Sequence, residues 1–292
     1  MSSELAVPRV PKKRVRGGPK VDLNIVRPDT DLVGTKQEKL QQLYSKWYGC
    51  EKCSLGQTRQ ATTGNRDIVF GEGNPNAHIL IVGEAPGEEE ERTNIPFVGP
   101  AGKLLNQLLA MCSDNPQIQE LVSWYHRDAR NTVNIEHFHK NITEWRYTEF
   151  MLTNSVCCRP VENATPNADM VKACWPRLWN LIYVVDPLLI VPCGNTALAA
   201  VMQKAKVKIT AERGRVFDVT HYGKIGRASY PVMPVFHTSY LLRRADWRSK
   251  DGDWKKSCDD WKRIMRVLDF LRLKHFGTPI PDRNFKQEVI LV

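Results

Sequence analysis

Residues 78–105 carry the sequence HILIVGEAPGEEEERTNIPFVGPAGKLL, and this stretch decides the fold prediction. Its first six residues, His78 to Gly83, form a short apolar run ending at glycine, which is typical of a buried β-strand. The polar segment that follows leads into Ala101 to Met111, where the spacing of apolar residues predicts a helix. Ligands of parallel sheets bind beyond the carboxyl ends of the strands, so we expect Glu84 to Gly87 to lie beside a binding site.

Two features of this loop have more than one interpretation. Gly83 and Gly87 allow the backbone to approach a ligand closely, and Pro86 stiffens the turn between them. The acidic run from Glu88 to Glu91 fits a solvated start of a helix, where the helix dipole favours carboxylates, about as well as it fits a metal site.

Three other apolar runs resemble the first strand, and helical patterns separate them. Strands that alternate with helices predict an α/β fold, with a mostly parallel sheet covered on both faces. The other predicted strands are Phe150 to Val156, Leu188 to Cys193 and Val232 to Phe236, and the other predicted helices are Lys36 to Tyr48, Asn167 to Val184 and Asn195 to Lys204.

A helical pattern also follows the last predicted strand. There, apolar residues recur at helical spacing, and we interpret them as a stripe facing the core rather than as a nucleic-acid surface. The residues are Trp254, Cys258, Trp261, Met265 and Leu268.

The charge of the chain is concentrated at its beginning. The formal net charge is +10, and residues 1–20 contain six basic residues against Glu4 alone. We expect residues 1–35 to be a disordered basic arm, either a solubilising tail or an arm that binds nucleic acid or directs localisation. The globular domain is predicted at 36–275, with an inserted, partly helical surface element at 113–148. Residues 276–292 are predicted to be a tail.

Composition excludes several classes of protein. No run approaches the roughly 20 apolar residues of a membrane span, and the charged N-terminus lacks the apolar segment of a signal peptide. We therefore expect an intracellular protein without membrane contact. In that setting the eight cysteines are thiols or metal ligands rather than disulfides.

Four of these cysteines have a spacing suited to metal. Cys50 and Cys53 form a C-x2-C pair, and Cys158 and Cys174 lie in a distant second segment. Four thiolates can bind zinc or a [4Fe-4S] cluster. The second segment lacks the short repeat of a zinc ribbon, which favours iron and sulfur. From spacing alone, Cys157 can replace its neighbour Cys158.

Five motifs together resemble the family 4 uracil-DNA glycosylases, the iron-sulfur branch of the uracil-DNA glycosylase superfamily that is also related to a phage DNA polymerase. They occur in the family's order between about residues 45 and 270. The motifs are GEAPGEEEE with IPFVGPAGKLL, LTNSVCCRP, the cysteine after it, VPCGNTAL and HTSYLLR.

The resemblance implies a fold and a cofactor. The fold is a three-layer α/β/α sandwich with a four-stranded parallel sheet. The cofactor is a structural [4Fe-4S] cluster held by Cys50, Cys53, Cys158 and Cys174, because the family's third ligand directly precedes Arg-Pro. Cys157 is then a bystander.

The resemblance also implies a base pocket. Phe97 matches the aromatic residue that stacks on the base, and Asn154 matches the residue that reads the uracil edge. The Asn154 amide offers a donor and an acceptor, which suits uracil and not cytosine. His237 matches the histidine near uracil O2, where a donor stabilises charge on the departing base.

Other residues are expected around this pocket. Gly83, Glu84 and Ala85 would line the uracil and place the water, and with Ala85 at the water-orienting position no strong general base is evident. His237 and Glu84 are the expected catalytic residues. The loop that wedges into DNA and holds its phosphates would contain Leu241, Leu242, Arg243 and Arg244.

The predicted function is therefore a monofunctional glycosylase that flips deoxyuridine from single- or double-stranded DNA and hydrolyses the base. The alternative is a weakly active or inactive iron-sulfur DNA-binding protein of the same fold that assists replication. A replication or repair protein is a further expected partner of the arm or the inserted element. The expected location is the cytoplasm, with nucleoid DNA, in a cell or a phage infection.

Overall fold

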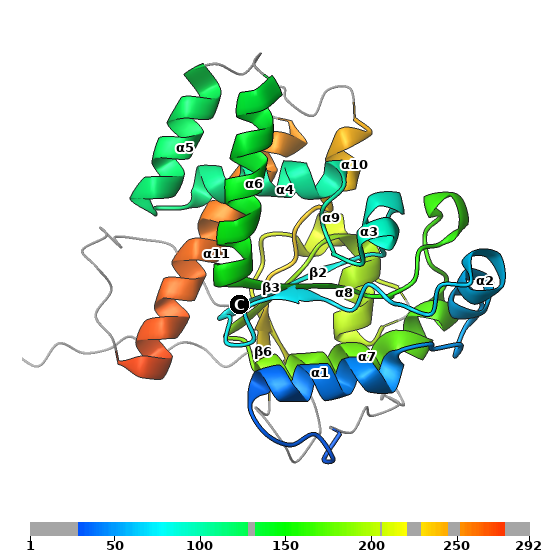
Figure 1. Ribbon diagram of the computed structural model, residues 1–292. Coiled ribbons are helices and arrows are strands. Elements are labelled where there is room, and N and C mark those ends of the chain that lie inside the picture. The colour runs from blue at the N-terminus through cyan, green and yellow to red at the C-terminus, as the bar shows by residue number, and fades with distance from the viewer. Residues whose placement is uncertain (1–28, 128–131, 205, 221–228, 245–251, 278–292) are drawn as a thin grey trace, which may run out of the picture.

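A computed structural model describes residues 29–127, 132–204, 206–220, 229–244 and 252–277. Most of the predicted basic arm, at 1–28, and the tail from 278 lie outside the described residues. Helices cover both faces of a six-stranded sheet (Figure 1). The strands are β1 (Glu72–Gly73), β2 (Ile79–Gly83), β3 (Phe150–Asn154), β4 (Leu189–Pro192), β5 (Phe217–Thr220) and β6 (Ser229–Val232).

Helices connect the central strands, as the alternating sequence pattern predicts. The four helices predicted before residue 205 are present with ends shifted by no more than two residues. The helices are α1 (Lys36–Trp47), α2 (Ser54–Thr63), α3 (Glu88–Thr93), α4 (Pro100–Cys112), α5 (Pro116–Arg127), α6 (Thr132–Glu149), α7 (Ala168–Val185), α8 (Gly194–Met202), α9 (Ile209–Glu212), α10 (Thr238–Leu242) and α11 (Asp253–Phe276), with a 3-10 turn at Val161–Asn163.

The sheet is mixed, whereas the sequence predicted four parallel strands. Its order is β1-β3-β2-β4-β6-β5. The four inner strands run parallel, and β1 and β5 pair antiparallel at the two edges. The edge strands escaped prediction because β1 has only two residues and β5 alternates exposed and half-buried residues, so neither contains an apolar run.

The strands β2, β3 and β4 are buried on both faces, which produces the three-layer sandwich, whereas β6 alternates buried and half-buried residues. Alternate residues of a strand point to opposite faces. Leu80 and Val82 of β2 pack with α1, α7 and α8, while Ile79 and Ile81 pack with α4 and α11. In Figure 1, α1 and α7 lie below the sheet, and α4, α6 and α11 lie on its other side.

The segment 113–148 was expected to be an inserted, partly helical surface element, and it consists mostly of α5 and α6. These helices share a small apolar cluster with α4, formed by Ala110, Ile118, Phe138 and Ile142. The segment is therefore packed onto the domain through its own core. Long connections of this kind need apolar burial to be ordered, and α5 and α6 have it.

Local contacts order α1 and α11, the first and last helices of the described chain. The capping box of Thr35 and Glu38 starts α1. At the other end, Trp261 and Leu268 of α11 are buried and Trp254, Cys258 and Met265 pack beside them, which confirms the predicted core-facing stripe.

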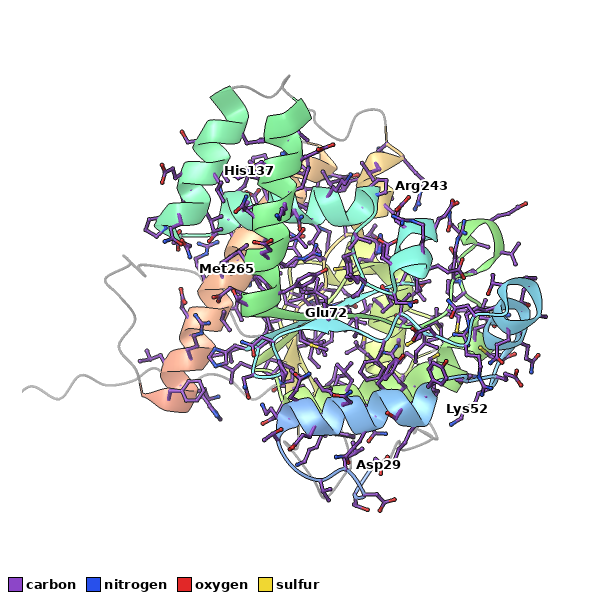
Figure 2. All side chains as sticks on the ribbon, in the orientation of Figure 1. Asp29, Lys52, Glu72, His137, Arg243 and Met265 are labelled. Carbon is purple, nitrogen blue, oxygen red and sulfur yellow. The ribbon has the colours of Figure 1, made fainter. Side chains whose placement is uncertain are left out.

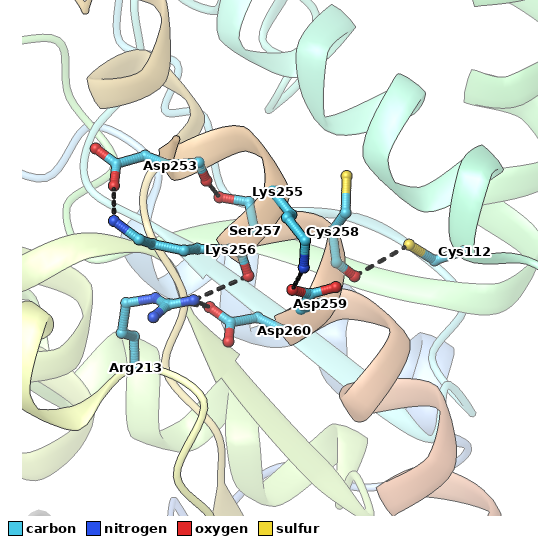
Figure 3. Close-up of polar contacts among 9 residues, drawn as sticks. All are labelled: Cys112, Arg213, Asp253, Lys255, Lys256, Ser257, Cys258, Asp259 and Asp260. Carbon is cyan, nitrogen blue, oxygen red and sulfur yellow. Dashed lines mark hydrogen bonds and ion pairs between the residues drawn. The ribbon is translucent and has the colours of Figure 1, made fainter. Parts of the chain in front are cut away.

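Two ion pairs lie in the first half of α11, one to a neighbouring segment and one within the helix (Figure 3). Arg213 contacts Asp260 at 2.8 Å, and burial raises the pKa of Asp260 to about 6 although Arg213 opposes this shift. Lys256 pairs with Asp253 within α11 at 2.9 Å.

Among the described residues, no helix is both long and apolar enough to cross a membrane.

Candidate active site

A cleft of about 510 Å³ opens at the carboxyl ends of β2 and β3, where the sequence predicted a binding site. The register places Gly83 opposite Asn154 at these ends. The expected site residues that line the cleft are Glu84, Ala85, Phe97, Asn154, His237, Leu242 and Arg243. The remaining lining includes Pro86, Gly87, Gly99, Pro160, Asn163 and Ser239.

Gly83 lies beneath two of these residues. A Cβ atom at Gly83 would collide with Oδ1 of Asn154 and with the ring of Phe97. The missing side chain thus brings the amide and the aromatic ring together over one backbone position. Gly83 supports the pocket from below, whereas the sequence expected it to line the uracil.

Asn154 ends β3 with 3% of its surface exposed. Its amide has no hydrogen-bond partner among the described residues, so its donor and its acceptor remain available to a ligand. Its backbone carbonyl accepts a hydrogen bond from Arg177 of α7. Arg177 is fully buried and also donates to Thr153 Oγ1 at 2.6 Å.

Phe97 lies in the loop between α3 and α4 with 6% of its surface exposed. Its φ of 58° is in the left-handed region, which is strained for a residue with a side chain. The Phe97 carbonyl accepts a hydrogen bond from Arg146 Nη2 at 3.0 Å, and it packs where a Cβ on Gly102 would clash. These contacts hold the strained backbone in place.

A buried carboxylate organises the same loop. Glu90 accepts hydrogen bonds from the backbone N–H groups of Gly87 at 3.0 Å, Val98 at 3.1 Å and Gly99 at 2.8 Å. Its neighbours Glu88 and Glu91 pair with Arg159 instead. The fourth residue, Glu89, pairs with Arg92 at 2.7 Å. The acidic run therefore divides into one loop-ordering residue and three residues in ion pairs.

His237 caps the N-terminus of α10 and is held through one ring nitrogen. Its Nδ1 accepts the Ser239 backbone N–H at 3.1 Å. The neutral ring therefore carries its proton on Nε2, which is then a hydrogen-bond donor. Burial lowers the pKa of His237, opposed by the negative charge of Glu84, so the ring is neutral at pH 7.

Glu84 is oriented by a neighbouring helix. Its Oε2 accepts a hydrogen bond from Thr196 Oγ1 of α8 at 2.6 Å. The carboxylate lines the cleft close enough to act on His237, and Ala85 lies beside it. At Glu84 and Ala85 the cleft therefore presents one carboxylate and backbone groups. Glu84 is the one carboxylate among the site residues that the sequence predicted.

The expected DNA-contacting residues separate into two groups. Leu241 is fully buried in the core beneath α4 and has no surface for DNA, which corrects its expected role. Leu242 is 45% exposed and lines the cleft with Arg243. Arg243 lies at the rim by α10, far from Asp29 below α1 (Figure 2). Arg244 contacts the Tyr240 hydroxyl at 3.4 Å.

The expected metal ligands come from three segments of the chain. Cys50 and Cys53 precede α2, Cys158 follows β3 and Cys174 lies on α7. Cys158 and Cys174 are buried in one apolar cluster, against which Cys50 and Cys53 pack. Burial raises the pKa of Cys158 to about 12, and the thiols of the other three contribute to this shift while Arg59 opposes it.

Arg59 supports the fit of an anionic group at these cysteines. It is 4% exposed, donates to Cys158 Sγ at 3.3 Å through Nη1, and has no partner for Nη2 within the described chain. A buried cation beside thiols compensates the charge of bound thiolates. No group of three or more His, Cys, Asp or Glu residues in the described part has the geometry to hold one metal ion.

Residues 70–268 match the model of the Uracil DNA glycosylase superfamily. The match covers more than half of the chain, and the chain belongs to this superfamily. It is 33% identical to a Type-4 uracil-DNA glycosylase of Thermotoga maritima over 209 residues, which are 72% of this chain and 86% of the relative. A second Type-4 enzyme, from Sulfurisphaera tokodaii, is 30% identical over 72% of this chain and 79% of its own length.

A DNA polymerase of Bacillus phage SP01 is 25% identical over 63% of this chain but only 16% of the polymerase. The predicted resemblance to family 4, including its phage polymerase relatives, is confirmed.

Sequence reasoning missed three residues that hold the cleft, namely Glu90, Arg146 and Arg177. Glu90 had a signal, because Gly-x-x-Glu before a helix is the spacing of a capping box. Arg177 also had one, since it lies one turn after Cys174 on the apolar face of a predicted helix. Arg146 had none, because its segment was expected at the surface.

Proposed function

We propose that this protein is a uracil-DNA glycosylase that removes uracil from DNA and leaves an abasic site. The observation that carries the proposal is the meeting of Phe97, Asn154 and His237 in one cleft. They come from a loop, a strand end and a helix start that are far apart in sequence. The names of the Type-4 relatives support the same activity.

Recognition follows from the two walls of the cleft. A flipped uracil would stack on the Phe97 ring, which the strained loop holds against Gly83. The Asn154 amide would donate to O4 and accept from N3–H. Cytosine presents the opposite pattern at these atoms, so it would leave both polar groups of the buried amide unpaired.

Hydrolysis follows from the charge that develops as the C1′–N1 bond breaks. The bond's electron pair leaves with the base, and the negative charge reaches uracil O2, where Nε2–H of His237 would donate a hydrogen bond. The sugar becomes cationic, and the Glu84 carboxylate would stabilise it and the attacking water. Water oxygen bonds to C1′, and its proton leaves to solvent or the uracil anion.

DNA would be held at the rim of the cleft. Leu242 is the exposed leucine of the expected wedge, and we assign it to the space left in the base stack by the flipped nucleotide. Arg243 would contact the phosphates beside it. A replication or repair protein bound by the arm or by 113–148 stays a prediction. A location in the cytoplasm with nucleoid DNA stays a prediction too.

Cys50, Cys53, Cys158 and Cys174 would hold a [4Fe-4S] cluster, which in this site supplies a structural link between the three segments. The hydrogen bond from Arg59 to Cys158 supports this choice over Cys157, which is buried to the same degree but receives no such bond among the described residues. A cluster takes one thiolate at each iron, so its ligands need not meet at a single point as zinc ligands do. Iron and sulfide analysis of anaerobically purified protein tests the assignment, and one zinc without iron would contradict it.

The activity is tested with a uracil-containing oligonucleotide and alkaline cleavage of the product. We expect cleavage at uracil in single- and double-stranded DNA without added metal, and none with cytosine in its place. His237→Ala should lower the rate about 10²- to 10³-fold, the usual cost of one donor to a developing anion. Intact oligonucleotide that remains bound to cluster-loaded protein would support the inactive binding protein instead.

A further inference from the structure

A second hollow, of about 690 Å³, lies outside the proposed active site between α7, α8 and α9. Its apolar floor contains Val171, Trp175 and Met202. Its lining is rich in lysine, with Lys172, Lys204, Lys206 and Lys208. We call this hollow the lysine groove.

Three of these lysines form a local pattern in the connection from α8 to α9. Lys204, Lys206 and Lys208 all line the groove, together with Val207 between the last two. All three are exposed, and their ammonium groups have no ion pair or hydrogen bond within the described residues. Asn195 pins the end of the segment by accepting the Ile209 N–H at 2.8 Å.

The other charges of the groove are already compensated. Lys172 lies 4.0 Å from Asp169, and Glu212 pairs with Arg215 at 3.4 Å. The uncompensated charge is therefore the three positive groups at 204, 206 and 208. Such a surface attracts a polyanion.

The lysine groove adjoins the proposed active site along two shared walls. Pro160, Asn163 and Ala164 line the cleft, and the same segment continues to Pro166 and Ala168 in the groove. At the second wall, Thr196 of the groove donates its hydrogen bond to Glu84 of the cleft.

We propose that the lysine groove binds the phosphate backbone of the DNA strand on one side of the flipped deoxyuridine. The inference rests on the proposed function, because the cleft sets where that strand begins. The groove starts where the cleft ends, and its unpaired cations match phosphate charge. An acidic protein segment would need no such continuity with a base pocket.

The experiment measures DNA binding with and without the three lysines. The test variant is Lys204→Ala, Lys206→Ala and Lys208→Ala together. The control combines Lys140→Ala, Lys262→Ala and Lys274→Ala, exposed lysines on α6 and α11 that remove the same charge. Single-stranded probes carry uracil near one end and extend in either the 5′ or the 3′ direction, and fluorescence anisotropy gives the Kd over a salt series.

We expect the test variant to flatten the slope of log Kd against log salt by about 2, since each single-strand phosphate contact contributes roughly 0.7. This loss should occur with one direction of extension and not with the other. The control should change neither slope selectively. In the excision assay the variant should raise KM and keep kcat.

An equal loss with both extensions, or a loss no larger than in the control, would overturn the inference and leave only general attraction. A poly-glutamate peptide provides a second test. If the wild type binds it, the test variant does not, and the salt slope of DNA binding is unchanged, then the groove binds an acidic protein. The binding assay does not depend on catalysis. If the wild type binds DNA with the expected salt slope but excises no uracil, the proposed function is wrong and the inference about the lysine groove still holds.

Discussion

The two walls of the cleft present a contrast in how a pocket is built. The Asn154 wall is the end of a central strand, and its neighbours β1 and β2 fix its register. The Phe97 wall is a loop with a residue in the left-handed region. Both walls nevertheless depend on a fully buried arginine that donates to the backbone carbonyl of the pocket residue.

The two arginines come from opposite faces of the sheet. Arg177 lies on α7, one turn after Cys174, and donates to the end of β3. Arg146 lies on α6 and connects Asn106 of α4, at 2.7 Å, to the Phe97 loop. Through Arg177, the strand-end wall is connected to the helix that carries Cys174. Through Arg146, the loop wall is connected to the segment 113–148.

Asn154→Ala should produce the largest effect, because it removes the polar groups that read uracil. We expect excision to fall about 10⁴-fold, the discrimination typical of a site built around paired hydrogen bonds. Affinity for DNA should stay within a few fold. Equal losses of excision and binding would show that Asn154 serves folding. The distinction between a wall that reads the base and a wall that stacks on it would then be wrong. Single-turnover rates and anisotropy provide the two readouts.

Phe97→Ala should have a smaller effect, because the loop wall contributes stacking rather than base reading. Stacking on an aromatic ring is worth about 1–3 kcal/mol per base. We therefore expect a loss of about five- to 150-fold in kcat/KM for uracil, with discrimination against cytosine preserved. A loss of discrimination as large as that of Asn154→Ala would show that both walls read the base.

Arg177→Met and Arg146→Met compare the two supports directly. Each leaves buried acceptors unpaired, which costs about 1–3 kcal/mol of unfolding free energy per group. Arg177→Met should lower the ratio of uracil to cytosine excision, and Arg146→Met should raise KM with the ratio unchanged. The two losses should add in the double variant if the walls are independent. Loss of visible cluster absorbance in Arg177→Met alone would sharpen the link to the cysteines.

The pH dependence of stability should show the smallest effect. Burial lowers the pKa of His237 in the folded protein below its unfolded value of about 6.5. Its neutral form therefore stabilises the fold fully above pH 6.5, and this contribution is lost as the pH falls below that value.

Urea unfolding of His237→Ala and the wild type at pH 7.5 and 5.5 measures this contribution. The wild type should lose more unfolding free energy than the variant between the two pH values. His275→Ala, at an exposed residue of α11, serves as the control and should behave as the wild type does. If the unfolding free energy depends on pH identically in all three proteins, His237 does not contribute to the pH dependence of stability.

Much of the site could be predicted because it lies next to strong local patterns. Asn154 ends an apolar strand. His237 follows another apolar run and directly precedes a short helix. Phe97 was found through a motif rather than a periodicity, since no pattern announces a left-handed phenylalanine. Leu241 and Leu242 could not be told apart in sequence, because adjacent leucines at a helix end are equally apolar and only packing against α4 buries the first.

The sequence by itself determined β2, β3 and β4, the helices between them and the end of the sheet where the cleft opens. These features follow from hydrophobic periodicity, which is local. The fourth predicted strand, Val232 to Phe236, shares only Val232 with β6. The tertiary structure alone decided the two edge strands, the docking of α5 and α6, and which backbone carbonyls Arg146 and Arg177 support. A buried arginine is stabilised by carbonyls from distant segments, and no pattern around it in sequence records where they lie.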